Sequence, residues 1–461
     1  MVRDVSKWRE LIREYGRLRS LTGHTPQSRG QRLNELIVEF LHCWGIEAAA
    51  SVRTTGEVDV VFAHSGVRFI LEAKWQQTKA DTGNIAKLQK RVRQRIAGTC
   101  GIFLSMSGYS AEALADVADG ERLEVLLLDV SHWEAMLAGL VPPDELLRLV
   151  HDRAAFFGQP HTPLVDLLTP AAGPPTVDFG LPDGVQDDVV RSSVDGVVAE
   201  VVLSGIDSDQ LGIACQRDGR LLVTTAQAIL RVDLKRQSVA VAVPVRDCHR
   251  NPLPLDDGSV LFARRHGVGR FKDGEVSTVG GGSVGNSSVL LNPDGSIWLF
   301  DNGYMGGISP SITRLGGRVG DESRQNIDYQ PASAFSSVWM SRDSLLTIGN
   351  SSFAVTSFPD GGTSSHAPTQ SNPMGIVHLG CGEVLTAGDG TSVQRTDTNT
   401  WVSDQLVDLT LNPSVNELAL GHNDDVYIAS YQPWVGPGMR FAVVRLTGLR
   451  RERVGEGGEP A

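Results

Sequence analysis

The sequence predicts two domains, an α/β domain followed by an all-β propeller of about six blades. In the first 157 residues, strand-like apolar runs alternate with amphipathic helices, which is typical of an α/β layer sandwich. Further along, Asp-Gly-type turns begin at residues 218, 257, 294, 343, 382 and 424, and a short apolar run follows each turn. Repeats of about 40 residues that each form a small sheet are typical of a propeller. Five or seven blades are the alternatives to six.

The composition fits a soluble globular protein that contacts no membrane. Hydrophobic residues make up 41% of the 461 residues and charged residues 21%, which are ordinary values. No apolar run approaches the roughly 20 residues needed to span a bilayer, and the N-terminus lacks the features of a signal peptide. The five cysteines are far apart, which argues against a disulfide framework or a zinc site. We therefore expect a cytoplasmic protein, in which the Cys248-His249 pair is structural.

The net charge of -12 is unevenly distributed along the chain. Residues 1–95 hold 17 Lys and Arg against 10 Asp and Glu, whereas residues 151–461 hold 23 against 35. A basic front end on an acidic protein suggests that the front end meets a polyanion. The acidic rear would be repelled by the same partner.

Hydrophobic periodicity places the elements of the front domain. Helix 4–19 has one apolar face and is otherwise basic, so its basic face is either solvated or contacts DNA or a dimer partner. Gly45 is placed to end the second helix. The expected elements in order are helix 4–19, loop 21–27, helix 31–44, strand 49–53, strands 57–62 and 67–74, helix 83–98, strand 101–105, helix 111–118, strand 123–128, helix 132–140 and helix 144–157.

The two strands within residues 57–74 flank a Gly-containing turn and predict a β-hairpin. Paired residue numbers in this hairpin sum to about 131, so Asp59 lies opposite position 72. Glu72 and Lys74 are two residues apart on one strand and share a face. Charges among apolar strands are costly to desolvate without a partner, and carboxylate oxygens suit Mg²⁺. The hairpin therefore predicts a magnesium site.

Five short motifs follow one another between residues 28 and 140: Gly30-x-x-Leu33-Asn34-Glu35, Gly56-Glu57-Val58-Asp59, Glu72-Ala73-Lys74, Phe103-Leu104-Ser105 and Tyr109-Ser110-x-x-Ala113. In this order they resemble the Mrr-like restriction endonucleases of the PD-(D/E)XK nuclease superfamily. A bare Asp…Glu-x-Lys pattern occurs by chance in many sequences. The same residues on a hairpin, between a helix that carries a glutamate and a basic helix, form a more specific pattern. The resemblance implies a restriction-endonuclease-like α/β fold.

The resemblance also implies a role for each charged residue of the hairpin. Asp59 and Glu72, with the Ala73 carbonyl, would hold Mg²⁺, for which Mn²⁺ would substitute. Lys74 would orient and activate the attacking water. A bound metal neutralises charge on the phosphate and lowers the pKa of its water. A degenerate nuclease fold that only binds DNA is the alternative for the whole set.

Two further polar residues join this site by resemblance. Glu35 would approach from its helix and bind the metal directly or through water, and Gln76 resembles an auxiliary polar residue. A solvent-facing glutamate and a plain surface residue are the respective alternatives. Glu57 shares the face of Asp59 and is interpreted as a surface residue or as a neighbour of the metal ligands.

A basic helix follows the hairpin and is a candidate for contact with DNA phosphates. The alternative is a solvated charged face. No base-reading module is recognisable, so the sequence predicts no preference for a DNA sequence. The candidate DNA-binding residues are Lys87, Lys90, Arg91, Arg93 and Arg95.

The rear of the chain carries no motif that assigns a ligand to the propeller. Asp301-Asn302-Gly303 and Asn423-Asp424-Asp425 contain calcium-type ligands, but turns commonly have this composition. The repeat texture resembles six-bladed propellers of the NHL and gluconolactonase-like kind. We divide the chain into an N-terminal helix and loop (1–27), the nuclease-like domain (28–157), a Pro- and Gly-rich linker (158–198), the propeller (199–450) and a flexible tail (451–461).

The leading hypothesis is a magnesium-dependent DNA endonuclease with a propeller that senses or docks a protein or a small ligand. Such a fusion would suit bacterial restriction or antiviral defence, and we expect a homodimer or a higher homo-oligomer. The first alternative is a non-catalytic scaffold that holds nucleic acid and recruits protein through the propeller. The second is a propeller enzyme such as a lactonase, which predicts carboxylates around one metal in the propeller channel.

Overall fold

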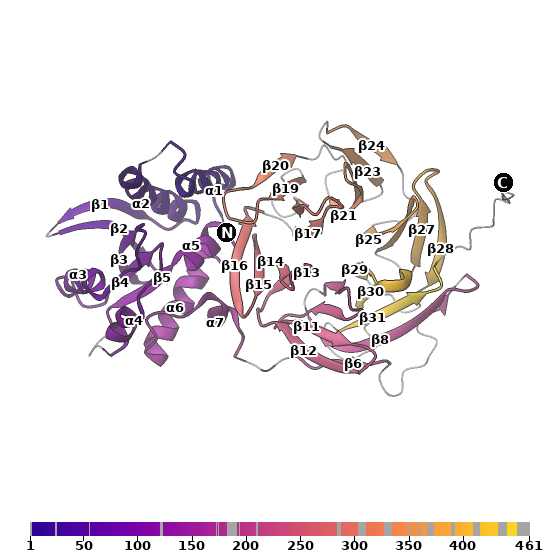
Figure 1. The fold of residues 1–461 in the computed structure, drawn as a ribbon, viewed down its shortest axis with the longest axis horizontal. Helices are drawn as coiled ribbons and strands as arrows, with labels where there is room; N and C mark the ends of the chain where they lie inside the picture. Colours follow the sequence, from indigo (N-terminus) through magenta and orange to yellow (C-terminus); the bar gives the residue numbers. More distant parts are fainter. Residues whose placement is uncertain are drawn as a thin grey trace.

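The computed structural model shows the two expected domains next to each other (Figure 1). It describes residues 2–23, 25–54, 56–119, 123–171, 173, 175–181, 191–192, 194–208, 211–283, 287–302, 310–326, 334–349, 352–358, 361–366, 373–388, 392–408, 415–431 and 440–449. The tail predicted at residues 451–461 lies outside these ranges. No helix within them is long and apolar enough to cross a membrane.

A five-stranded sheet forms the middle layer of the front domain, in the spatial order β1 (Ala48–Thr54), β2 (Gly56–His64), β3 (Val67–Lys74), β4 (Thr99–Ser105) and β5 (Val125–Asp129). Strands β1 to β3 pair antiparallel, whereas β3, β4 and β5 run parallel. Apolar residues from α2 (Pro26–Cys43), α5 (Val130–Leu137) and α6 (Pro143–Phe157) pack on one face. The other face is covered by α3 (Thr82–Arg93) and α4 (Ala111–Ala118). The predicted α/β layer sandwich is confirmed.

Two helix boundaries differ most from the predicted ones. Helix α2 begins at Pro26, inside the segment predicted as a loop, because Thr25 caps it: the Thr25 hydroxyl accepts from the Ser28 amide, and the Ser28 hydroxyl accepts from the Thr25 amide. Proline suits the first helical position, where no amide is needed. Helix α3 ends at Arg93, a few residues before the predicted end at Gly98.

The described strands of the rear domain form six sheets around a ring (Figure 1), which confirms the predicted six-bladed propeller. Each of the six predicted turns joins the first strand of a blade to the second. The first three blades are β9 (Ile213–Cys215), β10 (Leu221–Thr224), β11 (Ile229–Asp233) and β12 (Ser238–Val243); β13 (Cys248–Pro254), β14 (Val260–Arg264), β15 (Gly267–Lys272) and β16 (Glu275–Gly281); and β17 (Ser287–Leu291), β18 (Ile297–Asp301), β19 (Ser311–Leu315) and β20 (Ser323–Asn326).

The remaining blades include strands from the start of the rear domain. The fourth blade is β21 (Ala334–Ser341), β22 (Ser344–Gly349), β23 (Ser352–Ser357) and β24 (Thr363–His366). The fifth is β25 (Pro373–Gly380), β26 (Glu383–Gly388), β27 (Ser392–Asp397) and β28 (Val402–Asp408), with β7 (Arg191–Ser192) at its edge. The sixth is β29 (Val415–Leu420), β30 (Val426–Tyr431), β31 (Arg440–Thr447), β8 (Val198–Asp207) and β6 (Asp178–Phe179), with a 3-10 turn at His422–Asp424. Because β8 pairs with β31, the two ends of the domain close the ring.

The segment predicted as a linker contains a short helix, α7 (Leu164–Leu168). Leu164, Leu167 and Leu168 are buried and belong to the same apolar cluster as α2, α5 and α6. The connection is therefore anchored to the front domain at α7 before it reaches the propeller.

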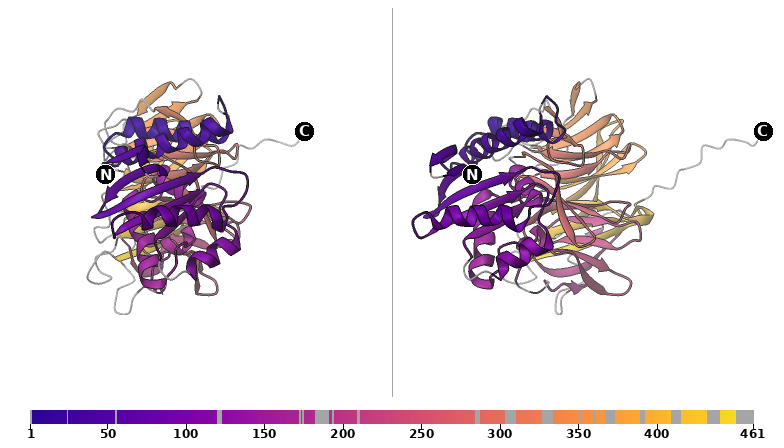
Figure 2. Two further views of the ribbon diagram at one scale, coloured as in Figure 1. Left: turned by 90° about the vertical axis from the view of Figure 1, so that its left-hand side faces the viewer. Right: turned by 60° about the vertical axis from the view of Figure 1, so that its left-hand side comes forward.

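Helix α1 (Val5–Arg19) lies where the front domain rests against one side of the propeller (Figure 2). Trp8 is fully buried, and its indole nitrogen donates to the carbonyl oxygen of Leu137 at 2.7 Å. Gly16 approaches Gly320 of the third blade so closely that a side chain at either position would collide with the other backbone. The cluster that contains Trp8 also contains Val243 and Phe262 of the propeller, so one apolar core continues from domain to domain.

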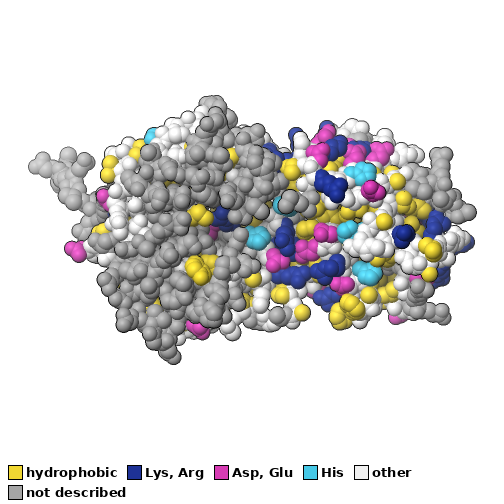
Figure 3. Space-filling view, turned by 180° about the vertical axis from the view of Figure 1, so that it is seen from behind, with side chains coloured by type: hydrophobic (Ala, Val, Ile, Leu, Met, Phe, Trp, Pro, Cys, Tyr) yellow, Lys and Arg dark blue, Asp and Glu magenta, His cyan; other side chains and the backbone are white. Residues whose placement is uncertain are grey.

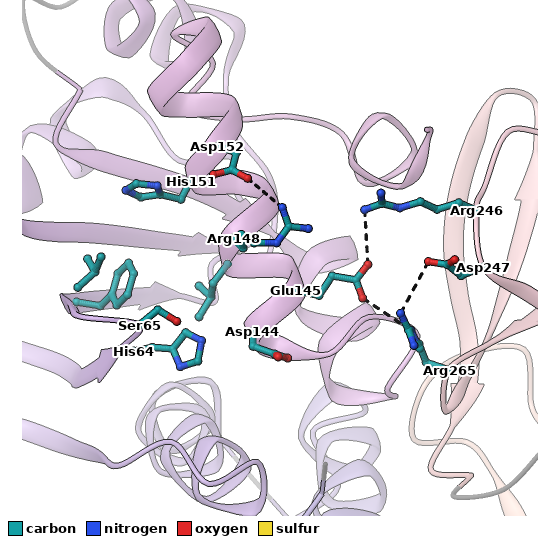
Figure 4. A pocket seen from close by; sticks show the side chains of 13 residues that line it. His64, Ser65, Asp144, Glu145, Arg148, His151, Asp152, Arg246, Asp247 and Arg265 are labelled. Atoms are coloured by element: carbon teal, nitrogen blue, oxygen red, sulfur yellow. Dashed lines mark hydrogen bonds and ion pairs between the residues drawn. The ribbon is translucent and has the colours of Figure 1, made fainter. Parts of the chain in front are cut away.

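Ion pairs surround Glu145 at a second part of the junction (Figure 4). The guanidinium of Arg264 is fully buried and contacts the Glu145 carboxylate at 2.5 Å and the Leu140 carbonyl oxygen at 2.8 Å. Arg246 and Arg265 approach the same carboxylate at 3.7 and 3.8 Å. Next to them lies a cleft of about 730 Å³ between α6, the β2–β3 turn and the propeller loops. On the face shown in Figure 3, side chains of both charges and histidines gather near the boundary between the domains.

Replacing Arg264 with alanine should destabilise the folded protein by about 3–5 kcal/mol, because Glu145 would lose its buried partner. Chemical denaturation followed by tryptophan fluorescence measures the change. Arg217→Ala is the matched control, since Arg217 also pairs with a carboxylate but is 81% exposed, and exposed pairs contribute little. Equal stability losses in the two variants would contradict the structural role of Arg264.

Candidate active site

The β2–β3 hairpin has the register expected from the sequence. Val60 pairs with Leu71 and Val61 with Ile70, which places Asp59 beside Glu72. Ser65 and Gly66 form the turn with φ values of 49° and 81°. Positive φ at both turn residues is typical of a two-residue hairpin turn, whose twist matches that of the strands.

Alternation along β3 turns the charged end of the hairpin toward α3. Ile70 packs in the apolar cluster with Ile85 and Leu88 of α3. Glu72 and Lys74 continue on that face, because side chains two residues apart point the same way. Glu72 is only 5% exposed although it is a carboxylate, so its charge requires partners nearby.

Two cations supply those partners. The Lys74 ammonium lies 3.2 Å from one carboxylate oxygen of Glu72, and the Arg91 guanidinium lies 2.5 Å from the other. Arg91 comes from α3, so the helix predicted to face DNA reaches directly into the candidate site. Lys74 and Arg91 remain partly exposed, which leaves both cations open to a substrate.

The second carboxylate, Asp59, is held by the backbone of β3. One of its oxygens accepts from the Ala73 amide at 2.9 Å. The pKa of Asp59 is nevertheless raised above its usual value: burial is the main cause and Glu72 adds to it, while the Ala73 amide, Lys74 and Arg91 act in the opposite direction. An acid that is buried beside another acid, with its charge incompletely compensated, is arranged to receive a further cation.

The two outlying candidates lie on the surface. Glu35 on α2 is 59% exposed and pairs with Arg32 at 2.9 Å, and Arg32 also holds Glu14 and Glu39. Gln76 is exposed, and its backbone oxygen accepts from the Ser107 hydroxyl. Their roles in the site remain predictions. The side chain of Glu57 lies outside the described part of the structure.

The other predicted DNA-binding residues line the exposed side of α3 and its C-terminal end. Lys87 and Lys90 are exposed, whereas Arg93 pairs with Glu124 at 2.7 Å. Arg95 is half-buried beyond the end of the helix. Lys87, Lys90 and Arg91 therefore remain the stronger candidates for contact with phosphate.

Sequence reasoning did not identify a cluster of Asp129, His132 and His161. The two Asp129 oxygens lie 2.8 Å from Nδ1 of His132 and 3.0 Å from Nε2 of His161. Burial raises the pKa of Asp129, but hydrogen bonds from both histidines lower it overall. Since β3, β4 and β5 are in register through Lys74, Ser105 and Asp129, the cluster lies at the same sheet edge as Lys74.

The structure gives this cluster a clear local role. Asp129 caps α5, and Nε2 of His132 donates to the carbonyl oxygen of Thr162 at 2.9 Å, which ties the segment before α7 to α5. Three such side chains within reach of one another are also able to hold a metal ion. An aspartate at the end of a buried strand with a histidine three residues later was the available sequence signal.

In the propeller, buried carboxylates pair with arginines. Asp301 contacts Arg9 at 3.3 Å and Arg324 at 3.7 Å. Asp425 contacts Arg445 at 2.6 Å. Gly303, which belonged to the first calcium-like motif, lies outside the described residues. Asp301 and Asp425, one acid from each motif, therefore have cationic side chains as partners.

Comparisons with known proteins gave one family match and several similar folds. Residues 27–137 match the family model Mrr_cat, described as restriction endonuclease. No curated protein is similar enough in sequence to count as a match. The solved structures that resemble the chain include a gluconolactonase from Xanthomonas campestris (13% identity, 59% of this chain and 98% of that one, TM-score 0.44). They also include a luciferin-regenerating enzyme (15%, 55% and 96%, 0.45) and the calcium-binding protein regucalcin from Agrobacterium tumefaciens (12%, 52% and 92%, 0.42). At such identities the likeness concerns the fold alone. The front of the chain is thus a restriction-endonuclease-like domain of the Mrr type, joined to a six-bladed β-propeller.

Proposed function

We propose that this protein is a metal-dependent DNA endonuclease whose cleavage domain is docked on a sensing or docking propeller. The observation that carries the proposal is the position of Asp59, Glu72 and Lys74 together at one end of a hairpin, within a domain that matches a restriction endonuclease model. Structural ion pairs alone do not explain why an apolar sheet buries two neighbouring carboxylates with a lysine and an arginine.

The donor set fits Mg²⁺ or Mn²⁺. Asp59 and Glu72, with the Ala73 carbonyl, would hold the ion, since hard cations prefer carboxylate and carbonyl oxygens. When bound, the ion would neutralise charge on the scissile phosphate and make its water more acidic. The raised pKa of Asp59 supports this assignment, because a cation would relieve the charge repulsion and desolvation that raise it.

Lys74 and Arg91 have separable roles in this proposal. Both neutralise Glu72 when no metal is present. With a metal on Glu72, Lys74 would give up one proton to solvent and, as the neutral amine, would orient the attacking water and accept its proton. Arg91 would be released to contact the phosphate backbone. Lys87 and Lys90 would extend that contact along the exposed face of α3.

We also propose a role for the propeller and a cellular setting for the protein. A domain that shares its core with a nuclease is placed to report the binding of a protein or a small ligand to it. A role in bacterial restriction or antiviral defence would suit this pairing. A reducing cytoplasm would suit the five cysteines, all in the described ranges and none in a disulfide. A homodimer would supply two sites for the two DNA strands.

Purified protein should nick supercoiled plasmid when Mg²⁺ is added, and Lys74→Ala should slow cleavage by about 10²–10⁴-fold, the usual contribution of a proton-transfer group. Agarose electrophoresis measures the rates. Lys79→Ala is the control, because Lys79 is a nearby exposed lysine outside the site. Equal cleavage by Lys74→Ala would refute the catalytic role. Salt-dependent DNA binding without cleavage by the wild type would favour the non-catalytic scaffold.

In a metal chelator, Asp59→Asn should make the folded protein more stable than the wild type at neutral pH. The pKa of Asp59 is raised in the folded state, so the folded protein holds the proton more tightly than the unfolded chain does. The free energy of unfolding therefore decreases as the pH rises through the folded-state pKa. The advantage of the variant should vanish at about pH 4, near the pKa of an unperturbed aspartate. Thermal denaturation measures both effects, and Mg²⁺ should stabilise only the wild type. If Asp59→Asn is less stable than the wild type at neutral pH in chelator, ionised Asp59 does not destabilise the folded protein and the expectation is wrong.

Arg91→Ala should bind Mn²⁺ about tenfold more tightly than the wild type, which corresponds to about 1.4 kcal/mol of relieved competition for Glu72. The same variant should bind and cleave DNA less well. Isothermal titration calorimetry with Mn²⁺ in the absence of DNA measures the affinity. Arg93→Ala is the matched control on the same helix, because Arg93 pairs with Glu124 instead. Unchanged Mn²⁺ affinity in Arg91→Ala would show that Arg91 does not compete with the metal.

A further inference from the structure

A cavity of about 310 Å³ lies between α1 and the propeller, away from the hairpin site. Ile12 of α1 and Thr313 of β19 are among the residues that line it. Its volume is at the lower end of the range of small-molecule pockets, about 300–1,000 Å³. Because its walls come from both domains, anything bound there touches both of them.

Guanidinium groups dominate the polar wall of this cavity. Arg9 and Arg13 come from α1, and Arg324 comes from β20. The pKa of Arg9 is lowered to about 10, chiefly by burial and also by the positive charge of Arg324, against the opposing effect of Asp301. Like charges are thus held close together in a partly dehydrated place, which is unfavourable unless an anion joins them.

Asp301 balances only part of this charge. Its carboxylate is 2% exposed and contacts Arg9 and Arg324 at 3.3 and 3.7 Å. Arg13 is exposed, and its one described hydrogen bond goes from Nε to the Arg9 carbonyl oxygen. Its terminal nitrogens therefore have no carboxylate partner among the described residues, and the cavity keeps an excess of positive charge.

Half-buried Glu322 adds a carboxyl oxygen, Oε1, that lacks a partner. Its Oε2 accepts from the Gly320 amide at 2.8 Å, whereas its Oε1 is buried without any hydrogen bond. Glu322 lines the cavity. Buried polar atoms almost always have partners, so an orphaned oxygen in a cavity wall requires an explanation.

We propose that this cavity is a binding site for a small molecule that carries a phosphate or carboxylate group. Arg9, Arg13 and Arg324 would bind the oxyanion, because the planar guanidinium matches both kinds of group with paired hydrogen bonds. Protonated Glu322 would donate its O–H from Oε1 to one of the ligand oxygens. The cavity has room for a molecule no larger than about a mononucleotide.

The protonation of Glu322 makes binding dependent on pH. Burial is the main cause that raises its pKa to about 7, with Asp321 adding to it and the Gly320 amide and Arg19 opposing it. Charged groups from several elements surround Glu322. Asp321 lies on its own loop, and Arg324 and Asp301 lie on β20 and at the end of β18. Helix α1 contributes Arg9, Arg13 and Arg19. The donating form exists below the pKa, so affinity falls as the pH rises past 7.

The site also links the domains. Helix α1 packs on α2 and shares the core of the front domain, whereas Glu322 and Arg324 belong to the third blade. A ligand that bridges Arg13 and Glu322 would fasten α1 to that blade. This inference does not rest on cleavage activity, since binding is measured without DNA or metal.

Calorimetry of the full-length protein with sulfate and with acetate tests the proposal, because neither anion titrates between pH 6 and pH 8. Adenosine monophosphate serves as a third, larger probe. We expect saturable binding of at least one probe. Arg13→Ala should weaken it about tenfold, as expected for the loss of a charge-assisted hydrogen bond. Arg17→Ala is the control, because Arg17 is an exposed arginine one turn further along α1 and does not line the cavity.

The variant Glu322→Gln distinguishes binding in this cavity from nonspecific binding of anions to the protein. Wild-type affinity for sulfate or acetate should fall about tenfold from pH 6 to pH 8, as a group with a pKa of about 7 loses its proton. The affinity of Glu322→Gln should be nearly constant over that range, since the amide donates at every pH. Equal weakening by Arg13→Ala and Arg17→Ala, a pH dependence that survives in Glu322→Gln, or no saturable binding of any probe would overturn the proposal.

Discussion

The apolar core that α1 shares with both domains is the constraint on which the rest of the structure depends. Trp8 is buried among residues of the front domain, and its cluster continues into the propeller through Val243 and Phe262. Separating the domains would expose this surface to water, at a cost of about 25 cal/mol for each Å² of apolar area. If the propeller acts as a sensor, as proposed above, its signal would reach the hairpin through side-chain rearrangement at this packed interface.

Buried charges are compensated differently at the junction of the domains and in the candidate site. At the junction, Arg264 is matched by Glu145 and backbone oxygens, so its charge is satisfied without any ligand. At the hairpin, Glu72 is neutralised by two cations, whereas Asp59 keeps a raised pKa. The site thus holds a local electrostatic cost, and such costs cluster where a protein binds or reacts.

Local pattern predicted the parts of the structure that are set by local physics. Strand alternation and a two-residue turn were sufficient for the register that brings Asp59 to Glu72, and repeated turns were sufficient for six blades. The sequence pattern did not predict contacts between segments that are far apart in the chain. The partner of Arg264 is 119 residues away. Prolines and glycines flank the leucines of α7, so the sequence predicts a linker there. The pairing of Glu72 with Arg91 depends on how α3 packs, which periodicity does not specify.

The closure of the ring by β8 and β31 affects how the protein folds during its synthesis on the ribosome. Strand β8 leaves the ribosome more than half a chain length before β31, its partner. The front domain is complete by then and folds first, as N-terminal domains do during synthesis. Until the last strand emerges, the apolar side of α1 and α5 has no finished propeller to cover it. A truncated chain would therefore expose this surface, and it would carry a folded front domain without a finished propeller.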